Sequence, residues 1–147
     1  MYARIMVAID GSTTSDRALE EAIAFTKDQK AQLRLVHVVD QTPIMQADIG
    51  WPDNDELEDI FVKSGQRIVD DAVQKAAKGG LKAEASVLRS SGKRIANVIV
   101  DEAKEWSAQL LVVGTHGRHG VERLLLGSVA EGVLRAASMP VLLIHGQ

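Results

Sequence analysis

The sequence predicts a three-layer α/β/α sandwich with a five-stranded, mostly parallel β-sheet. Short apolar, β-branched runs alternate with amphipathic stretches along all 147 residues, which is the pattern of parallel strands joined by crossover helices. The strand-like runs are continuously apolar, as expected for strands that are covered on both faces. No repeat, linker or low-complexity segment interrupts this order, so we expect residues 1–147 to form a single domain.

The first half of the chain predicts two strands and two helices. The apolar run ARIMVAI (3–9) is a strand that ends at DGS, and the helical spacing over 13–29 follows, with Ser12, Thr13 or Thr14 as its cap. The run LRLVHVV (33–39) is the second strand. Residues 40–55 lose all periodicity and contain two prolines. Their apolar side chains could fold over a ligand, meet a partner or pack on the domain, and we expect them to pack on the domain. A long amphipathic helix occupies 54–80 and is closed by Gly79-Gly80.

The second half continues the alternation. Strands are expected at 83–88, 110–114 and 140–144, and helices at 92–106 and 127–137. Because ligands of open α/β sheets bind beyond the carboxyl ends of the strands, two turns stand out. These are the Asp10-Gly11-Ser12 turn after the first strand and the glycine-rich loop after the fourth.

Composition excludes several classes of protein. The chain has no cysteine, which removes disulfides, thiol catalysis and thiolate metal sites. Its net charge of −3 argues against a nucleic-acid-binding protein, which needs a basic face. No apolar run reaches the ~20 residues of a membrane helix, and the N-terminal segment lacks the order of a signal peptide. We therefore expect a cytoplasmic protein that binds neither nucleic acid nor membrane.

The loop after the fourth strand has the residues of an anion site. Gly114 and Gly117 lie three residues apart, and Gly127 and Ser128 follow at the start of a helix. Glycines allow a phosphate to approach backbone N–H groups, and a helix N-terminus adds unpaired donors and a favourable dipole. Two arginines and two histidines in the same loop add positive charge (Arg118, Arg123, His116 and His119). The Ser-x-x-Glu spacing of Ser128 also predicts a capping box, which closes a helix without any ligand.

Known phosphate-binding and metal-binding motifs do not fit this loop. No lysine precedes Ser128, so it is no Walker A sequence, and DGSTTSD after the first strand lacks the dinucleotide fingerprint. His116 and His119 have the spacing of a metal pair, but two ligands do not make a site, so we assign no metal site. His37, on an apolar strand, is expected to be structural.

The spaced glycines and the sequence VAIDGS together resemble the universal stress protein family. RALEEAIAF, LVHVV, LLVVGTHGR and MPVLLIH extend the likeness over essentially the whole chain. It implies a flavodoxin-like sheet in the order 3-2-1-4-5 and a homodimer. Members of the family with the full Gly-x2-Gly-x9-Gly-Ser motif bind ATP, and this chain has it. Gln109 departs from the aspartate common at that position.

Carried over onto this chain, the resemblance implies a set of nucleotide contacts. The first strand would meet the nucleotide at Ala8 and Asp10, and the Val38 backbone would read adenine. Val113 and Gly114 would lie near the ribose. The residues implied around the phosphates are Gly117, Arg118, Gly127, Ser128 and Val129. Mg²⁺ would arrive with the phosphates. Asp10 also has a purely structural interpretation, as the cap of its own turn.

Three functions remain open at this point. The first is a nucleotide-dependent regulatory homodimer of the stress response, without catalytic residues and with slow or no hydrolysis, since no residue is placed to orient water. The second is a weak ATPase or another adenine-nucleotide enzyme. The third is a nucleotide-free interaction module. We expect the dimer to form by pairing of the last strand, Val141 to Ile144, with its twofold copy.

Overall fold

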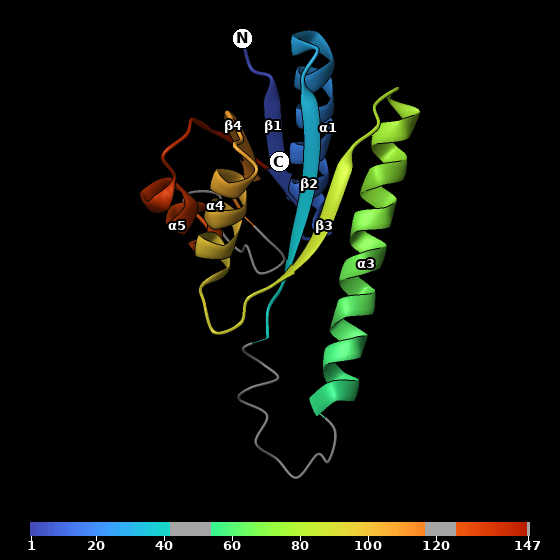
Figure 1. Ribbon diagram of the computed structural model, residues 1–147, viewed down its shortest axis with the longest axis vertical. Helices are drawn as coiled ribbons and strands as arrows, with labels where there is room; N and C mark the ends of the chain where they lie inside the picture. Colours follow the sequence, from blue (N-terminus) through green and yellow to red (C-terminus); the bar gives the residue numbers. More distant parts are fainter. Residues whose placement is uncertain (42–53, 117–125, 147) are drawn as a thin grey trace.

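A computed structural model describes residues 1–41, 54–116 and 126–146 of the chain (Figure 1). Its elements follow the predicted alternation, and the labels below are those of Figure 1. The order along the chain is β1 (Arg4–Ala8), α1 (Thr13–Gln29), β2 (Gln32–Val39), α3 (Asn54–Lys78), β3 (Glu84–Arg89), α4 (Ile95–Glu105), β4 (Leu110–Gly114), α5 (Ser128–Ala136) and β5 (Val141–Ile144).

The five strands form one parallel sheet in the order β3-β2-β1-β4-β5. β1 lies between β2 and β4, with Arg4 opposite Gln32 on one side and Ile5 opposite Leu110 on the other. The fold class predicted from the sequence and the strand order implied by the family resemblance are therefore confirmed. The chain moves outward from β1 in one direction and then crosses to β4, so the strand order reverses between β1 and β4.

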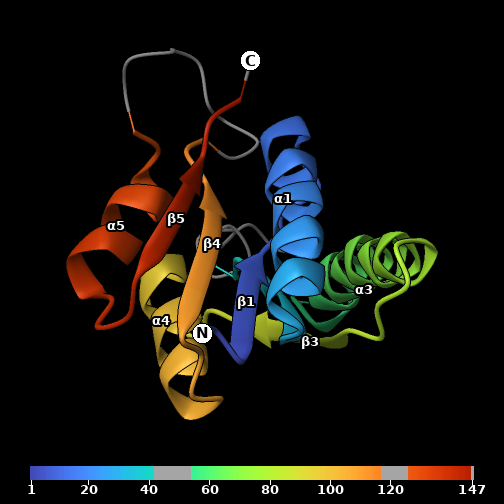
Figure 2. The same ribbon diagram turned by 90° about the horizontal axis from the view of Figure 1, so that it is seen from above.

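Helices cover both faces of the sheet. Viewed from above, α1 and α3 lie on one side, and α4 and α5 lie on the other (Figure 2). Alternate residues of each strand enter opposite layers: Ile5 and Val7 pack with α1 and α3, whereas Met6 packs with α4 and α5. These side chains are fully buried, and each contributes roughly 1.5–3 kcal/mol through removal from water. This two-sided burial explains the continuously apolar strands.

Local signals set the ends of the helices. Ser12 caps α1 by accepting the Ser15 N–H at 3.1 Å, and α3 ends before Gly80, whose φ of +85° suits glycine. α4 begins at Ile95, later than the expected residue 92, because Ser91 and Gly92 form a turn with positive φ. No helix among the described residues is long and apolar enough to cross a bilayer.

Candidate functional site

A cavity of about 410 Å³ opens at the carboxyl ends of β1, β2 and β4, where the strand order reverses. Open α/β sheets bind their ligands at this position, and the volume lies within the range of small-molecule sites. The predicted contacts that the structure describes all line this cavity: Ala8, Asp10, Val38, Val113, Gly114, Gly127, Ser128 and Val129. Gly117 and Arg118 lie outside the described residues, as do His119 and the apolar side chains of the 42–53 segment.

The turn after β1 forms one rim of the cavity. Asp10 Oδ1 accepts the Ser12 N–H at 2.9 Å, and the Asp10 N–H donates to the Ser15 hydroxyl at 3.0 Å. The same turn caps α1, so Asp10 has the structural role considered from the sequence and also faces the cavity. Its position is fixed by hydrogen bonds before any ligand binds.

The end of β2 presents backbone groups to the cavity. The Ile9 N–H donates to the Val36 carbonyl at 2.9 Å, so Val36 directs its main-chain groups toward β1. Val38, two residues further, points its N–H and carbonyl to the same side, where β1 has already ended at Ala8. The Val38 main chain therefore faces the cavity, and its side chain is in the core beneath α4 and α5.

The N-terminus of α5 forms the opposite rim. The helix begins at Ser128 and has Gly127 as its N-cap, with no side-chain capping hydrogen bond. The predicted capping box is therefore wrong: Ser128 is one residue too late to be the cap, and Glu131 pairs with Arg135 at 2.8 Å instead. The first turn of α5 adds its dipole and amide groups to the cavity wall.

Close packing explains two of the glycines without any ligand. A Cβ on Gly127 would lie 2.9 Å from the Thr115 carbonyl oxygen, and a Cβ on Gly114 would lie 2.8 Å from Thr14 Cγ2. Moreover, the Gly127 N–H donates to the Thr115 carbonyl at 2.7 Å. The glycines bring α5 and α1 against the end of β4, and this close approach shapes the cavity.

His37 connects β2 to the end of β1. Its Nδ1 lies 2.8 Å from the Ile9 carbonyl, which can only accept, so this nitrogen carries the proton. The ring packs on α3 at Gly65, where a Cβ would lie 2.8 Å from His37 Cδ2. This arrangement agrees with the structural role expected for His37, although the ring also lines the cavity.

Much of the apolar wall was absent from the sequence prediction. α3 contributes Phe61 and Ile68, and α4 contributes Ile95 and Ile99. The one signal for this wall in the sequence is the amphipathic pattern of α3. His116 also lines the cavity, although the sequence indicated it only as a loop charge or half of a metal pair.

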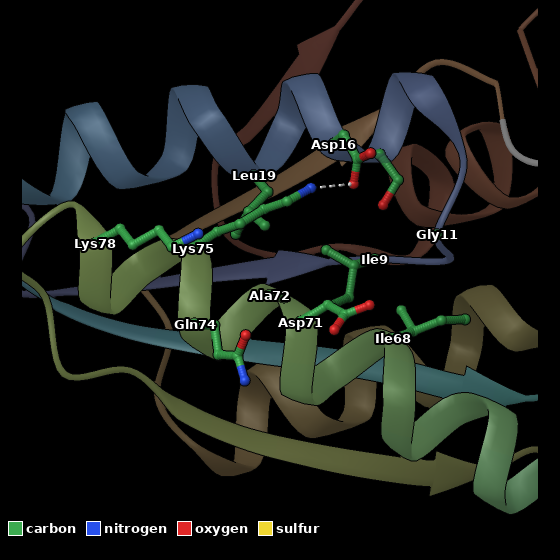
Figure 3. Close-up of a pocket in the computed structure, with 11 residues that line it drawn as sticks. Ile9, Gly11, Asp16, Leu19, Ile68, Asp71, Ala72, Gln74, Lys75 and Lys78 are labelled. Atoms are coloured by element: carbon green, nitrogen blue, oxygen red, sulfur yellow. Dashed lines mark ion pairs between the residues drawn. The ribbon is translucent and has the colours of Figure 1, made fainter.

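A second cavity of about 330 Å³ lies between α1 and α3 (Figure 3). Ile9, Leu19 and Ala72 contribute to its apolar lining, and the Lys75 Nζ bonds Asp16 Oδ1 at 3.2 Å across it. Both side chains of this ion pair are 47% exposed. None of the predicted contact residues lines this groove, so it is not part of the candidate site.

An open parallel sheet with a cavity at its switch point places the chain among the doubly wound α/β proteins. A model of the universal stress protein family matches residues 1–145. The chain therefore belongs to the universal stress protein family. The universal stress protein YxiE of Bacillus subtilis is 35% identical over 99% of this chain and 100% of its own length.

Solved structures agree with this assignment. A universal stress protein family member from Burkholderia pseudomallei has a TM-score of 0.78 and 34% identity, covering 97% of this chain and 96% of that one. Two other similar structures contain nucleotides. One is an Archaeoglobus fulgidus universal stress protein in complex with dAMP, with 28% identity, a TM-score of 0.67 and coverage of 97% and 98%. The other is a universal stress protein in complex with cAMP, with 26% identity, a TM-score of 0.70 and coverage of 99% and 98%.

Proposed function

We propose that residues 1–147 form one domain that binds ATP in the cavity at the carboxyl edge of the sheet, and that the protein acts as a nucleotide-dependent regulator in the stress response. One observation carries this proposal. Contacts that the family resemblance implies come from the ends of β1, β2 and β4 and from the start of α5, and every one that the structure describes lines the same cavity.

The chemistry of the cavity suits an adenine nucleotide. Ile95 and Ile99 offer an apolar surface for a base, while the Val38 main chain offers a donor and an acceptor along its edge. The N-terminus of α5 lies at the other rim, and its dipole favours an anion. An adenine base at the end of β2 and phosphates at the start of α5 would fit the chemistry of the two rims of the cavity. The dAMP and cAMP complexes of two relatives support this class of ligand.

The described residues favour binding over catalysis. Hydrolysis needs a group that orients a water molecule in line with the terminal phosphate. Asp10 holds its own turn through Oδ1, and no other described residue has a clear claim to that role. We therefore propose slow or absent hydrolysis, with Mg²⁺ bound through the phosphates and not by a protein site. A weak ATPase and a nucleotide-free interaction module are the competing functions.

Analysis of co-purified nucleotide tests the proposal. The protein is purified without added nucleotide and denatured, and the released small molecules are identified by chromatography. ATP in the supernatant is expected, and its survival would indicate slow hydrolysis. ADP would favour the weak ATPase. A protein that is empty and shows no heat of binding with added ATP would leave the interaction module.

Competition between ATP and GTP tests the mode of base recognition. The Val38 N–H and carbonyl should match the acceptor and donor on the edge of adenine but not those on guanine. Binding of GTP would therefore leave buried polar groups unpaired. We expect GTP to bind at least about tenfold more weakly than ATP in calorimetry. Equal affinities would contradict base recognition by Val38 while leaving phosphate binding intact.

We further propose that the protein is a homodimer that pairs through β5. All four residues of β5 are only half-buried, and β5 is an edge strand of the sheet. The Ile144 carbonyl accepts the Thr115 N–H at 2.9 Å, so Ile144 directs its main chain toward β4. Leu143 therefore directs its N–H outward, where a twofold copy could pair with it.

Substitutions at Leu143 test this dimer. Leu143→Glu should split it, but Leu143 also packs in the layer of α4 and α5, so a charge there affects folding as well. Leu143→Pro removes the outward N–H and keeps the ladder to β4. Light scattering should show a dimer for the wild type and a monomer for Leu143→Pro. A monomeric wild type at micromolar concentration would refute the dimer.

A further inference from the structure

One ring nitrogen in the cavity lacks a hydrogen-bond partner. His116 is the second residue after the end of β4, and it lines the cavity beside the start of α5. The Nε2 atom is buried and has no hydrogen-bond partner among the described residues. A buried donor or acceptor without a partner lowers the stability of the fold. At a binding cavity, a ligand group can supply the missing partner.

Thr115 determines which ring nitrogen carries the proton. Its Oγ1 lies 3.1 Å from His116 Nδ1, and the residue is 1% exposed. If Nδ1 donated to this oxygen, the buried hydroxyl hydrogen would need another acceptor. Nδ1 is the only side-chain hydrogen-bond partner of Oγ1 within the described parts of the chain. The arrangement that satisfies both groups has the Thr115 hydroxyl donating to Nδ1, which leaves the proton on Nε2.

The neighbourhood of Nε2 favours an anionic acceptor. A Cβ on Gly127, the N-cap of α5, would lie 3.4 Å from the His116 Cα, so the ring is attached directly beside the first turn of this nine-residue helix. The N-cap has no side chain that could accept from that turn. An N–H donor and a helix N-terminus at one rim of the cavity both favour negative charge there.

We propose that His116 donates a hydrogen bond from Nε2–H to the phosphate chain of the bound nucleotide, with Thr115 as the positioning residue that keeps the proton on Nε2. This role rests on the proposed nucleotide binding and adds the His116 side chain to the backbone donors at the start of α5. It also gives the Thr115-His116 pair a function that does not depend on metal binding.

Calorimetry with ATP and adenosine tests the contact to the phosphates. His116→Leu should weaken ATP binding about tenfold or more, which is the usual effect of losing a hydrogen bond to a charged group. Adenosine affinity should change less than about twofold, because the base end of the cavity lies at β2. His145→Leu is the matched control: His145 is exposed after β5, and its replacement should leave both affinities unchanged.

The tautomer provides a readout that a merely structural role would not move. The ¹⁵N shifts of the His116 ring should show the proton on Nε2 in the free wild-type protein, and ATP but not adenosine should shift that signal. Thr115→Val keeps the shape but removes the hydroxyl, so it should let the proton move to Nδ1 and weaken ATP binding severalfold. These spectra of the wild type do not depend on whether His116→Leu folds.

Several outcomes would overturn the inference. They are wild-type ATP affinity in His116→Leu, equal losses for ATP and adenosine, or a proton on Nδ1 in the free protein. In each of these cases the proposed ATP binding stands. A wild-type protein that binds no ATP would instead remove the proposed function itself, and the role of His116 with it.

Discussion

The polar groups at the amino ends of the strands and those at the carboxyl ends are arranged in opposite ways; we call these two sides the amino edge and the carboxyl edge of the sheet. At the amino edge, Arg34 donates to Glu84 at 2.8 Å and to Glu102 at 2.7 Å, and its guanidinium lies over the ring of Trp106. Arg4 approaches the same ring and donates to the Trp106 carbonyl at 2.6 Å. The Nε of Arg34 has no partner among the described residues, but the charge is already shared between two carboxylates.

At the carboxyl edge, a cavity takes the place of such a network. The main chain of Val38 points past the end of β1, α5 begins without a side-chain cap, and His116 Nε2 is unpartnered within the described residues. Polar groups that satisfy one another stabilise the fold, whereas unsatisfied groups around a cavity are available to a ligand. The comparison predicts that substitutions at the first edge change stability and that substitutions at the second change binding.

The largest expected effect is at the amino edge. Arg34→Leu leaves two carboxylates without their cation, and the side chains of Arg34 and Glu102 are only 19% and 16% exposed. Breaking a buried pair costs about 3–5 kcal/mol, and partial exposure lowers this to about 2–3 kcal/mol in urea unfolding. ATP affinity should not change. A stable variant with impaired ATP binding would contradict the assignment of stability to the amino edge and of binding to the carboxyl edge.

Gly127→Ala should change both properties, because Gly127 belongs to the cavity and to the packing of α5. The new Cβ meets the Thr115 carbonyl oxygen at 2.9 Å, and such overpacking costs about 1–3 kcal/mol. The new Cβ should displace the start of α5 and thereby also weaken ATP binding. Gly92→Ala is the control: its φ of +81° makes alanine costly by about 1–2 kcal/mol, but it lies outside the cavity. Full stability in Gly127→Ala would contradict the packing argument.

An unpartnered group far from the cavity should behave differently from His116. Thr26 in α1 is fully buried, and its Oγ1 has no partner among the described residues. Thr26→Val removes this hydroxyl and should raise the free energy of unfolding by about 1 kcal/mol. Thr13→Val, exposed in the same helix, should change it by less than about 0.5 kcal/mol. A destabilised Thr26→Val would indicate that the hydroxyl has a partner.

The smallest expected effect concerns the groove between α1 and α3 (Figure 3). Lys75→Gln breaks the ion pair with Asp16, but both side chains are 47% exposed. Exposed pairs contribute little, so we expect a loss below about 0.5 kcal/mol and an unchanged affinity for ATP. Altered ATP binding in this variant would show that the groove and the nucleotide cavity are coupled.

Periodicity predicted the fold well because the central strands β1, β2 and β4 are largely buried and the helices are amphipathic. It failed at local detail. The Ser-x-x-Glu spacing could not distinguish an N-cap from the first helical residue, so Ser128 was misassigned. Helix propensity across Lys93 and Arg94 likewise hid the turn that delays α4 to Ile95.

The candidate site could be predicted only where a motif marks it. The glycine spacing identified the β4 and α5 walls, but it could not show that Gly127 packs on Thr115. The apolar walls from α3 and α4 depend on how those helices cross the sheet, which no short pattern encodes. The hydrogen bond between Thr115 and His116 depends on side-chain orientation and was equally invisible in the sequence.

The 2.7 Å hydrogen bond between the Gly127 N–H and the Thr115 carbonyl has a consequence for the evolution of the protein. It joins Thr115, just after β4, to Gly127, just before α5, so the packed core holds these two described positions together. Doubling the length of a closed loop costs only about 0.6 kcal/mol. Stability therefore limits the length between these two anchors only weakly, and we expect nucleotide binding to be what conserves the Gly-x2-Gly-x9-Gly-Ser spacing, so that a change of length should lower the affinity for ATP before it lowers stability.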